Sequence, residues 1–418
     1  MNRFKFVLKS RGIGNSVERG WQVARRFGLT SARMERRLLR YTDVVARYGG
    51  RPSLPITARV LARNPQVTRR LLERGVELCV HSLVHNDLTQ LAPDAQAEQI
   101  AAACAVFRDH GIPFKGFRSP YLKYNEATLR AVAAAGFAYD SNLPFFWGPL
   151  ASLDHLAPRE REGLEMGLRF YHPVGRPRER SLPRLIGTLV EIPVSLPDDE
   201  ILLDRMGCPA PRLGEVWGEM LEQALSTGEL LTLQLHPERI EILAEVLDGL
   251  VARAASSGQV WLATLGEIAA WWEERLAQEV IIEKAGAGRY SVRAGTALRA
   301  DVSLFDRARG TTAQLRLPAT VASSRQPVIG IHPAASADLR IKLKEDGYFI
   351  AITSDSEACA VYLGPGTDLR MAKETIARSK ECLLVQGTWP APFRAALAAT
   401  GDIDCLTLGD FVRRFWEG

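Results

Sequence analysis

The sequence predicts an α/β fold with a parallel sheet covered by helices, followed by a small all-β domain and a short α/β tail. Three observations predict it. Apolar runs of strand length alternate with segments of helical periodicity from about residue 50 to residue 277. Short strand-like runs replace this alternation over 278–365, and the alternation returns over 366–418. Repeated strand–helix units form a parallel sheet, either open or closed into a barrel.

The elements of the first domain follow one another in a regular order. Residues 20–48 are mainly helical, with an interruption near Gly28, and residues 141–187 are rich in Pro, Arg and Gly and predict a long loop. The predicted strands lie at 52–61, 76–81, 114–117, 137–139, 188–194, 230–235 and 260–263, and the predicted helices at 66–74, 93–110, 126–135, 212–226, 239–256 and 265–276.

We therefore divide the chain into a basic N-terminal segment (1–19), an α/β domain (20–277), a β-sandwich-like domain (278–365) and an α/β tail (366–418). The tail resembles a degenerate repeat of the end of the α/β domain, because Leu230–Pro237 and Cys382–Pro390 have similar patterns. The histidine of the first pattern is missing from the second. We expect the tail to be structural rather than catalytic.

Composition places the chain among folded proteins. Of its 418 residues 46% are hydrophobic and 24% are charged, and no apolar run is long enough for a transmembrane helix. The N-terminus lacks the apolar core of a secretory signal, and the six cysteines are scattered without a C-x-x-C pattern. These features predict a cytoplasmic protein. They indicate no particular oligomeric state.

Charge is unevenly distributed along the chain. Residues 1–75 hold 18 Lys and Arg against 4 Asp and Glu, a balance of +14, so with a net charge of +5 the remainder carries −9. Such a basic region suits an acidic partner, either an anionic membrane surface at the inner face or an acidic or phosphate-linked glycan. A solvated arginine-rich helix face is the alternative. Nucleic acid is not expected, because no nucleic-acid-binding motif accompanies the charge.

Polar side chains follow the predicted strands at their carboxyl ends, where active sites of such folds gather. They are His81 and His85, Arg118, Asp198 with Asp199, and His236. The pair His81-Ser-Leu-Val-His85 directly follows the strand Val76–Val80, so two imidazoles come within reach of one divalent metal ion.

Four segments together resemble the polysaccharide deacetylases, the NodB-type carbohydrate esterase family 4. His81–His85 matches the metal motif H-[ST]-x-x-H, and Phe117-Arg-Ser-Pro-Tyr121 matches R-x-P-[YF]. Glu191–Asp199 resembles the strand-and-acid motif of the allantoinase-like and peptidoglycan-deacetylase-like branch, and Leu233–Pro237 resembles the closing motif with the catalytic acid. The motifs occur in the family's order over roughly 20–275.

The resemblance implies a deformed, TIM-like (β/α) barrel that hydrolyses an N-acetyl or O-acetyl group with a divalent metal, most simply zinc. His81 and His85 would hold the metal, which acidifies bound water and polarises the amide carbonyl. A carboxylate would be the general base, and His236 would protonate the leaving amine. By family analogy Arg118 orients the base, and the backbone N–H of Tyr121 helps to hold the oxyanion.

One part of the family pattern is missing from the expected place. The T-F-D-D motif, which gives the family its base and third metal ligand, precedes the first barrel helix, but Arg26–Met34 contains no aspartate. Three interpretations stay open. Asp198 or Asp199 supplies the carboxylate, or water or substrate completes a weaker metal site, or the chain has lost catalysis and keeps a glycan-binding cleft.

The sequence thus predicts a deacetylase-like hydrolase acting on a glycan or a lipid- or nucleotide-linked sugar in polysaccharide metabolism. The alternatives are a catalytically impaired protein of the same fold that binds a glycan or a partner, and a small-molecule linear-amide hydrolase of the allantoinase-like branch. Each site residue also has a structural interpretation: Arg118 could pair with Asp198 or Asp199, and these two acids could cap the helix that follows them.

Overall fold

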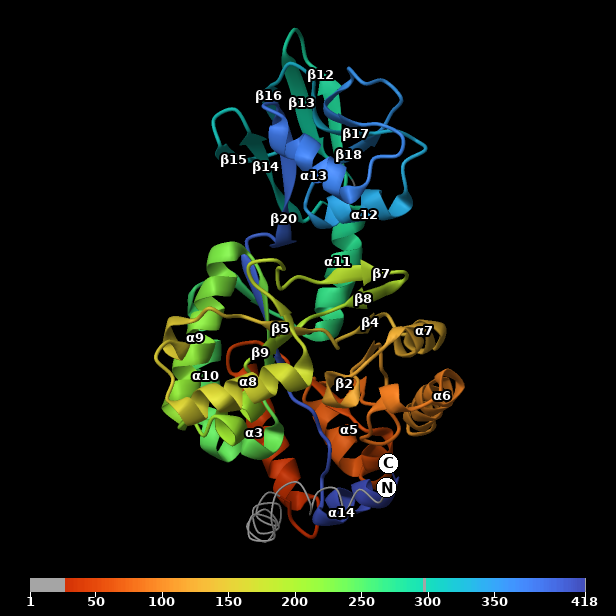
Figure 1. Cartoon of the computed structure of the whole chain (residues 1–418), viewed down its shortest axis with the longest axis vertical. Coiled ribbons are helices and arrows are strands. Elements are labelled where there is room, and N and C mark those ends of the chain that lie inside the picture. The colour runs from red at the N-terminus through yellow and green to blue at the C-terminus, as the bar shows by residue number, and fades with distance from the viewer. Residues whose placement is uncertain (1–26, 296–297, 418) are drawn as a thin grey trace. The chain divides into compact units, whose positions relative to one another are not determined.

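The structure, a computed structural model, describes residues 27–295 and 298–417, so the basic segment 1–19 lies outside the described residues. The chain forms two compact units. One runs from the N-terminus through Ala269 and is completed by Ala395–Gly418, and the other is Ala270–Arg394. The α/β tail that the sequence predicted as one piece is therefore divided, and its last part belongs to the first unit (Figure 1).

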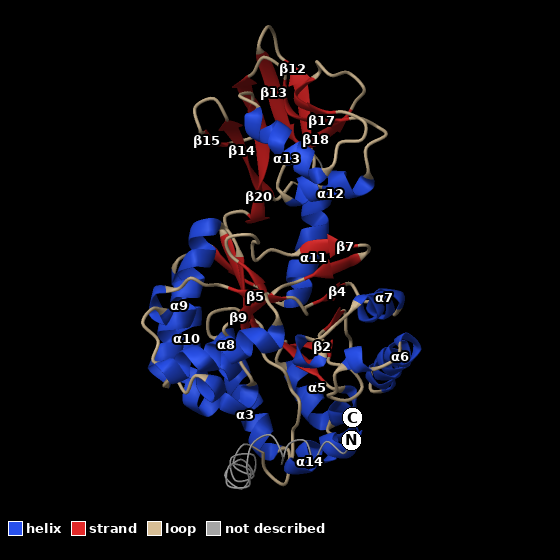
Figure 2. Ribbon diagram, in the orientation of Figure 1, coloured by secondary structure: helices blue, strands red, loops and turns tan. Residues whose placement is uncertain are grey.

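The first unit is a curled, mainly parallel sheet with helices outside it, which confirms the predicted deformed barrel (Figure 2). Its strand order is β10-β21-β1-β2-β3-β4-β8-β7, with β11 also paired to β21 and only β7–β8 antiparallel. The strands are β1 (Ser53–Ile56), β2 (Glu77–Val80), β3 (Gly116–Phe117), β4 (Tyr139–Asp140), β7 (Arg184–Ile186), β8 (Leu189–Glu191), β10 (Leu230–Gln234), β11 (Val260–Leu262) and β21 (Ala395–Thr400). A smaller parallel sheet has β5 (Pro144–Phe146), β6 (Val174–Gly175) and β9 (Val194–Leu196).

Strand β21 comes from the end of the chain and completes the middle of the sheet. It pairs in parallel with β10 from Leu230↔Ala396 to Gln234↔Thr400, and Thr400 also lies opposite Ser53 of β1. All six of its residues are buried, as expected for an inner strand of a parallel sheet. The blue ribbon of β21 runs through the first unit between segments of much earlier sequence (Figure 1).

Helices flank this sheet, with α9 and α10 on one side and α5 to α7 on the other (Figure 1). The helices of the first unit are α3 (Ala32–Ala46), α4 (Ala58–Arg63), α5 (Pro65–Glu73), α6 (Pro93–Asp109), α7 (Glu126–Ala134), α8 (Pro158–Tyr171), α9 (Ala210–Thr227), α10 (Ile240–Ser256) and α14 (Leu408–Glu417), and α11 (Leu265–Ala277) runs into the second unit. Short 3-10 turns are η1 (Leu88–Gln90), η2 (Pro120–Leu122), η3 (Ala151–Leu153) and η5 (Pro237–Arg239), and η4 (Glu200–Arg205) is a π-helix. Among the described residues no helix is long and apolar enough to cross a bilayer.

The segment predicted as a long loop contains the 14-residue helix α8 and strands β5, β6 and β7. Helix α8 begins with Pro158 and lies against the π-helix η4. Its glycines permit this contact, since a Cβ at Gly163 would collide with the Arg205 backbone and one at Gly167 with Ile201. The Pro, Arg and Gly content that suggested a loop therefore includes helix-start and close-packing positions.

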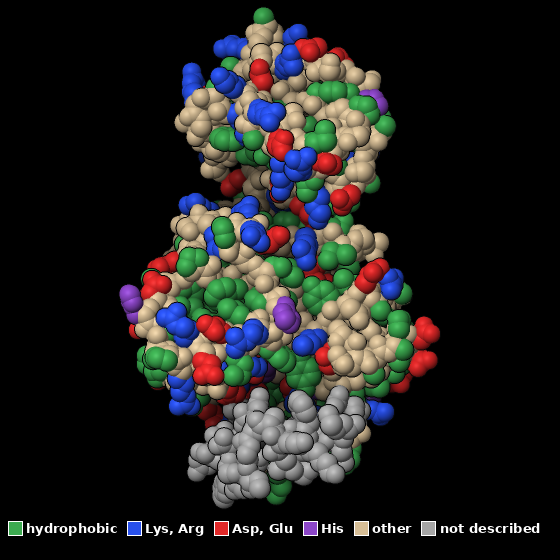
Figure 3. All heavy atoms as spheres, in the orientation of Figure 1, with side chains coloured by type: hydrophobic (Ala, Val, Ile, Leu, Met, Phe, Trp, Pro, Cys, Tyr) green, Lys and Arg blue, Asp and Glu red, His purple; other side chains and the backbone are tan. Residues whose placement is uncertain are grey.

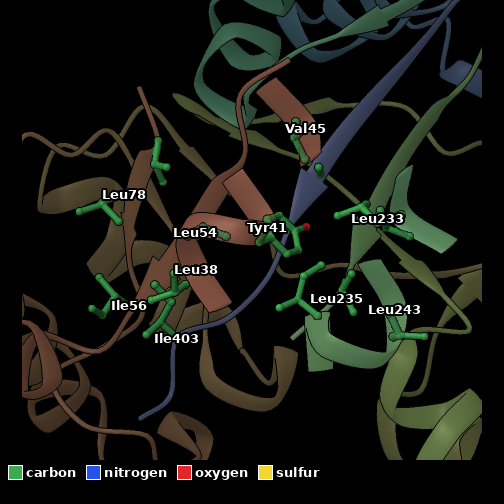
Figure 4. Packing of buried hydrophobic residues seen from close by; sticks show 14 of the residues in the cluster. Leu38, Tyr41, Val45, Leu54, Ile56, Leu78, Leu233, Leu235, Leu243 and Ile403 are labelled. Atoms are coloured by element: carbon green, nitrogen blue, oxygen red, sulfur yellow. The ribbon is translucent and has the colours of Figure 1, made fainter. Parts of the chain in front are cut away.

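The core of the first unit joins residues from both ends of the chain. Figure 4 shows Tyr41 of α3 between Leu54 of β1 and Leu233 of β10. The Tyr41 hydroxyl donates a 3.0 Å hydrogen bond to the carbonyl of Thr400, and Ile403 belongs to the same buried cluster. The end of the chain is therefore part of the barrel's core packing.

Arginines of the basic region that the structure describes are mostly paired with acids of the first unit. Arg37 meets Glu241, Arg47 meets Asp248 and Arg63 meets Asp410. Further pairs join Arg51 to Glu267, Arg70 to Glu35 and Arg74 to Asp43. Blue and red side chains are accordingly interspersed on the visible face of this unit (Figure 3). These contacts fit a solvated, ion-paired helix surface.

Over its described residues the second unit has three three-stranded sheets and, besides the end of α11, the helices α12 and α13, so it is not all-β as predicted for 278–365. Two sheets are antiparallel, in the orders β12-β13-β16 and β15-β14-β20, and the third, β18-β17-β19, is parallel. The elements are β12 (Val280–Lys284), β13 (Arg289–Ala294), β14 (Ala300–Asp306), β15 (Thr311–Leu315), β16 (Ala319–Ala322), β17 (Gln326–Ile331), α12 (Ala337–Glu345), β18 (Ile350–Ile352), β19 (Cys359–Leu363), α13 (Leu369–Arg378) and β20 (Cys382–Pro390). Parallel strands need a crossover helix, and α12 supplies it between β17 and β18.

Candidate metal and acid–base site

Two histidines stand at the carboxyl end of β2. His81 directly follows the strand and is fully buried, and His85 lies four residues further on. The His81 ring places Nδ1 2.7 Å from the carbonyl oxygen of Arg118. Because a carbonyl only accepts, Nδ1 carries the proton and Nε2 keeps its lone pair free. This is the usual orientation of a metal-binding imidazole.

Two aspartates reach the histidines from the segment that follows β21. Asp404 lies with Oδ1 3.5 Å from His81 Nε2 and Oδ2 3.2 Å from His85 Nε2. Asp402 lies with Oδ2 3.8 Å from His81 Nε2. The potential ligand atoms of His81, His85 and Asp404 all fall within 4.8 Å of one another. The carboxyl end of a parallel strand thus delivers acids to the same rim as the histidines.

The donor set of this cluster fits a zinc-type ion. His81 Nε2 and Asp404 Oδ1 are both buried and have no hydrogen-bond partner among the described residues. A buried polar atom without a partner is costly, so two such atoms facing one another are suited to binding a metal ion. Two imidazoles and one carboxylate form a common ligand set of catalytic zinc.

Charge around the cluster favours a neutral His85 and an ionised Asp404. Burial, aided by the positive charge of Arg414, lowers the pKa of His85 well below its usual value, so its imidazole is neutral. Burial raises the pKa of Asp404, but His85 and Arg414 outweigh it and hold that pKa well below its usual range. Neutral imidazole and ionised carboxylate are the forms that bind a metal ion.

Arg118 holds Asp402 in place from the interior of the barrel. Its side chain is fully buried, and Nη1 donates to Asp402 Oδ1 at 3.2 Å and to Thr400 Oγ1 at 2.9 Å. The same nitrogen lies 2.5 Å from Gln234 Oε1, and Nη2 donates to Ser141 Oγ at 2.8 Å. A guanidinium fixed on several sides orients the Asp402 carboxylate.

His236 also lines the site, and Asp199 holds its ring and its backbone N–H. Its Nδ1 lies 2.8 Å from Asp199 Oδ1, and its backbone N–H donates to Asp199 Oδ2 at 3.0 Å. Burial lowers the pKa of His236, but Asp199 outweighs it and raises that pKa well above the usual value. Burial raises the pKa of Asp199, but Arg239 and His236 lower it to about 2. The pair therefore stores a proton on His236 at neutral pH.

A cavity of about 370 Å³ joins these groups, and Asp198 and Tyr121 lie on its wall. Asp198 accepts from the backbone N–H of Ile201 at 2.8 Å, and Tyr171 contacts it at 3.4 Å through its hydroxyl. Burial, with the charges of Asp199 and Glu200, raises the pKa of Asp198 to about 7. Tyr121 has a φ of 61°, which turns its ring edge-on to His85 at 4.4 Å between centroids.

The structure brings the predicted residues His81, His85, Arg118, Tyr121 and His236 to one site. The two predicted acids belong to the same site but do not contact the histidine pair: Asp199 binds His236, and Asp198 lies on the cavity wall beside Tyr171. The carboxylate beside the histidines is Asp404 instead, from the tail that was expected to be structural. Arg118 pairs with Asp402 rather than with Asp198 or Asp199.

Sequence reasoning missed Asp402 and Asp404, although a signal for them exists. The apolar run Ala395–Thr400 is followed by Gly401-Asp402-Ile403-Asp404, which is a strand with acids at its carboxyl end. In space the segment that carries these acids leads to the start of α3, the first described helix of the unit. The N–H of Leu408 donates to the carbonyl of Gly28 at 2.9 Å, and α3 begins shortly after Gly28.

Comparison with known proteins identifies a deacetylase-like segment in the first unit. Residues 19–139 match the sequence profile of the family described as polysaccharide deacetylase, which confirms the resemblance drawn from the motifs. A peptidoglycan deacetylase-like protein of Gibberella zeae is 31% identical over 81 residues, which are 19% of this chain and 24% of the relative. The chain thus spans about a quarter of the length of that curated relative.

Solved structures give weaker likenesses. A probable polysaccharide deacetylase from Pseudomonas aeruginosa PAO1 is 17% identical with a TM-score of 0.45, covering 57% of this chain and 72% of that one. The allantoinase PuuE is 16% identical with a TM-score of 0.43, covering 57% of this chain and 72% of that one.

Proposed function

We propose that this chain is a metal-dependent deacetylase-type hydrolase that removes an N-acetyl or O-acetyl group from a glycan or from a lipid- or nucleotide-linked sugar. One observation carries the proposal. His81 Nε2 and Asp404 Oδ1 are buried, have no hydrogen-bond partner among the described residues and face one another. Beside them lie Asp402, which Arg118 holds, and His236, which Asp199 holds. Asp402, Asp404 and His236 line one cavity. These are the parts that metal-assisted acyl hydrolysis needs.

The family match supports this proposal once chain order is taken into account. In the family the acid motif precedes the first barrel helix, whereas Asp402 and Asp404 follow the last strand here. The barrel therefore has the arrangement of a circular permutation, in which the first strand of the family has moved to the end of the chain. The aspartate motif is displaced in sequence and kept in space, which favours an active enzyme over an impaired one.

His81, His85 and Asp404 would hold the metal. A divalent ion bound there, most simply zinc, supplies an acidified water and polarisation of the acyl carbonyl. His85 and Asp404 line the cavity, so water or substrate would reach a metal ion held there.

Asp402 would be the general base. Its Oδ1 is held by Arg118 Nη1 at 3.2 Å, and Oδ2 faces the metal ligands, 3.8 Å from His81 Nε2. A carboxylate fixed on one oxygen can accept a proton from water on the other. Arg118 thus positions Asp402 to accept that proton.

His236 would be the general acid for the departing amine or alcohol. It lines the cavity, and its Asp199 partner fixes the ring through Nδ1, which directs Nε2 away from Asp199. Arg239 Nη1 lies 3.2 Å from Asp199 Oδ2 and stabilises that buried carboxylate. The backbone N–H of Tyr121 would help to hold the oxyanion.

Acetate release tests the proposal directly. Zinc-loaded protein is incubated with chito-oligosaccharides, O-acetylated xylan and nucleotide-linked acetamido sugars, and acetate is measured. We expect release from at least one of these substrates and none from His81→Ala. Release from none of them, with turnover of allantoin instead, would assign the site to the small-molecule amide branch and contradict the glycan assignment.

A further inference from the structure

The two histidines of the metal cluster have different second partners. His81 Nδ1 lies 2.7 Å from the carbonyl oxygen of Arg118, which only accepts hydrogen bonds. His85 Nδ1 lies 2.5 Å from Nη2 of Arg414, which only donates. The polarity of the second partner is thus opposite for the two rings.

This difference fixes opposite tautomers. When Nδ1 of His85 accepts from Arg414, the single proton of the neutral ring sits on Nε2 and points at Asp404 Oδ2, 3.2 Å away. A metal ion bound by Nε2 needs the reverse, with the lone pair on Nε2 and the proton on Nδ1. An N–H at Nδ1 cannot face a guanidinium N–H at hydrogen-bond distance. Arg414 and an Nε2-bound metal therefore exclude one another at His85.

The charges of the cluster point the same way. Arg414 Nη1 also lies 3.2 Å from Asp404 Oδ2, and Arg118 lies 3.2 Å from Asp402. The two guanidiniums balance the two carboxylates without any metal. A divalent cation adds two positive charges next to Arg414 and repels it.

Resting on the proposed function, we propose that Arg414 is a positioning residue that competes with the metal ion for His85 and Asp404. In the metal-free chain it holds His85 in the Nε2–H tautomer, and metal binding requires its guanidinium to leave Nδ1. The last turns of α14 thereby set the metal affinity of the site.

The surroundings of Arg414 allow this release. Its side chain is 22% exposed and lines the cavity beside the cluster. Release needs only a side-chain rotation toward the cavity, since Arg414 sits near the C-terminal end of α14 rather than between two strands. Because zinc must displace Arg414 from His85, we expect this site to bind zinc more weakly than a site in which both histidines donate through Nδ1 to a hydrogen-bond acceptor.

Zinc affinity of matched variants tests the proposal. The full chain, Arg414→Gln and Arg413→Gln are titrated with zinc in competition with a chromophoric chelator. Both variants remove one positive charge from α14. Arg413 is exposed and belongs neither to the cavity lining nor to the ion pairs of the cluster, whereas a glutamine at 414 can accept the Nδ1–H of His85. We expect Arg414→Gln to bind zinc about 10-fold to 100-fold more tightly than the unmodified chain, and Arg413→Gln to match it within about twofold. Equal or weaker binding by Arg414→Gln would overturn the proposal.

The tautomer of His85 gives a second readout that needs no metal. In zinc-free protein with ¹⁵N-labelled histidine, the spectra should show the lone pair of the His85 ring on Nδ1. In Arg414→Gln the lone pair should lie on Nε2. The variant His85→Gln identifies which signal belongs to His85. A lone pair on Nε2 in the unmodified chain would refute the role of Arg414. If no variant binds zinc, the proposed function fails. The ¹⁵N spectra then still decide whether Arg414 determines the tautomer of the His85 imidazole.

Discussion

The candidate site combines residues from two distant parts of the chain. The histidine side consists of His81, Arg118 and His236, which follow β2, β3 and β10 within residues 77–236. The carboxylate side is built by one strand, β21, and carries Asp402 and Asp404. The first side can be recognised as motifs in order, whereas the second depends on a strand pairing across more than 160 residues. The carboxylate side therefore has to be identified from the folded structure rather than from the order of motifs along the chain.

Truncation after Arg394 is the most drastic way to separate the two sides. It removes β21 from between β10 and β1 and leaves the buried Arg118 without Thr400 and Asp402. We expect loss of cooperative unfolding in the first unit, measured by near-ultraviolet circular dichroism on heating. A chain that ends at Thr407 keeps β21 and serves as control. A cooperatively folded barrel in the 1–394 chain would show that the tail is dispensable.

Asp402→Asn should separate catalysis from metal binding on the carboxylate side. Asparagine keeps the shape but cannot take a proton, so kcat should fall about 10²-fold to 10⁴-fold. Zinc content should stay near that of the unmodified chain, because Asp404 is untouched. A fall of less than tenfold would exclude Asp402 as the base.

Asp199→Asn should alter the pH profile through the histidine side. Asp199 raises the pKa of His236, and the acid must be protonated to act, so kcat/KM falls as pH rises through that pKa. Removing the carboxylate lowers the pKa of His236 and moves this limb to lower pH, with a loss of roughly tenfold or more above neutral pH. Glu238→Gln, which removes a weaker raising charge, should move the limb less. An unmoved limb in Asp199→Asn would assign it to another group.

The smallest expected effect concerns a buried carboxyl pair that supports the histidine side. Asp140 and Glu191 are fully buried at the ends of β4 and β8, and Glu191 accepts from the backbone of Asn142, which in turn binds the backbone of Ser119 beside Arg118. Burial, with the neighbouring Glu191, raises the pKa of Asp140 well above its usual value, and burial raises that of Glu191.

A raised pKa in the folded state means that the folded chain holds a proton that the unfolded chain releases. The stability contribution is therefore complete below the usual carboxyl pKa and is lost as pH rises toward the folded value. Asp140→Asn removes this loss, so it should be more stable than the unmodified chain at pH 8 by about 1 kcal/mol and show no gain at pH 4. Thermal unfolding at both pH values measures this, and a loss of stability at pH 8 would contradict it.

The sequence predicts most of the first barrel because its signals are local. Apolar runs mark β2 and β10, and the polar residues behind them, His81 and His236, lie where parallel strands end. Helix α8 was missed because its proline and glycines resemble loop residues when their packing partner η4 is not known.

The aspartates could not be assigned from local pattern alone. Strand β21 is a short apolar run like many others, and only its pairing with β10 and β1 places Asp402 and Asp404 at the site. Asp198 and Asp199 had the right residue type on the right rim. The Asp198 side chain instead contacts Tyr171, and the Asp199 side chain contacts His236 and Arg239.

Zinc affinity of Asp404→Asn against Asp198→Asn tests the central claim most directly. Both changes replace one carboxyl group on the wall of the same cavity by an amide. If the end of the chain supplies the third ligand, Asp404→Asn weakens zinc binding by at least about 100-fold and Asp198→Asn leaves it within a few-fold. Strong zinc binding by Asp404→Asn together with its loss in Asp198→Asn would contradict the account.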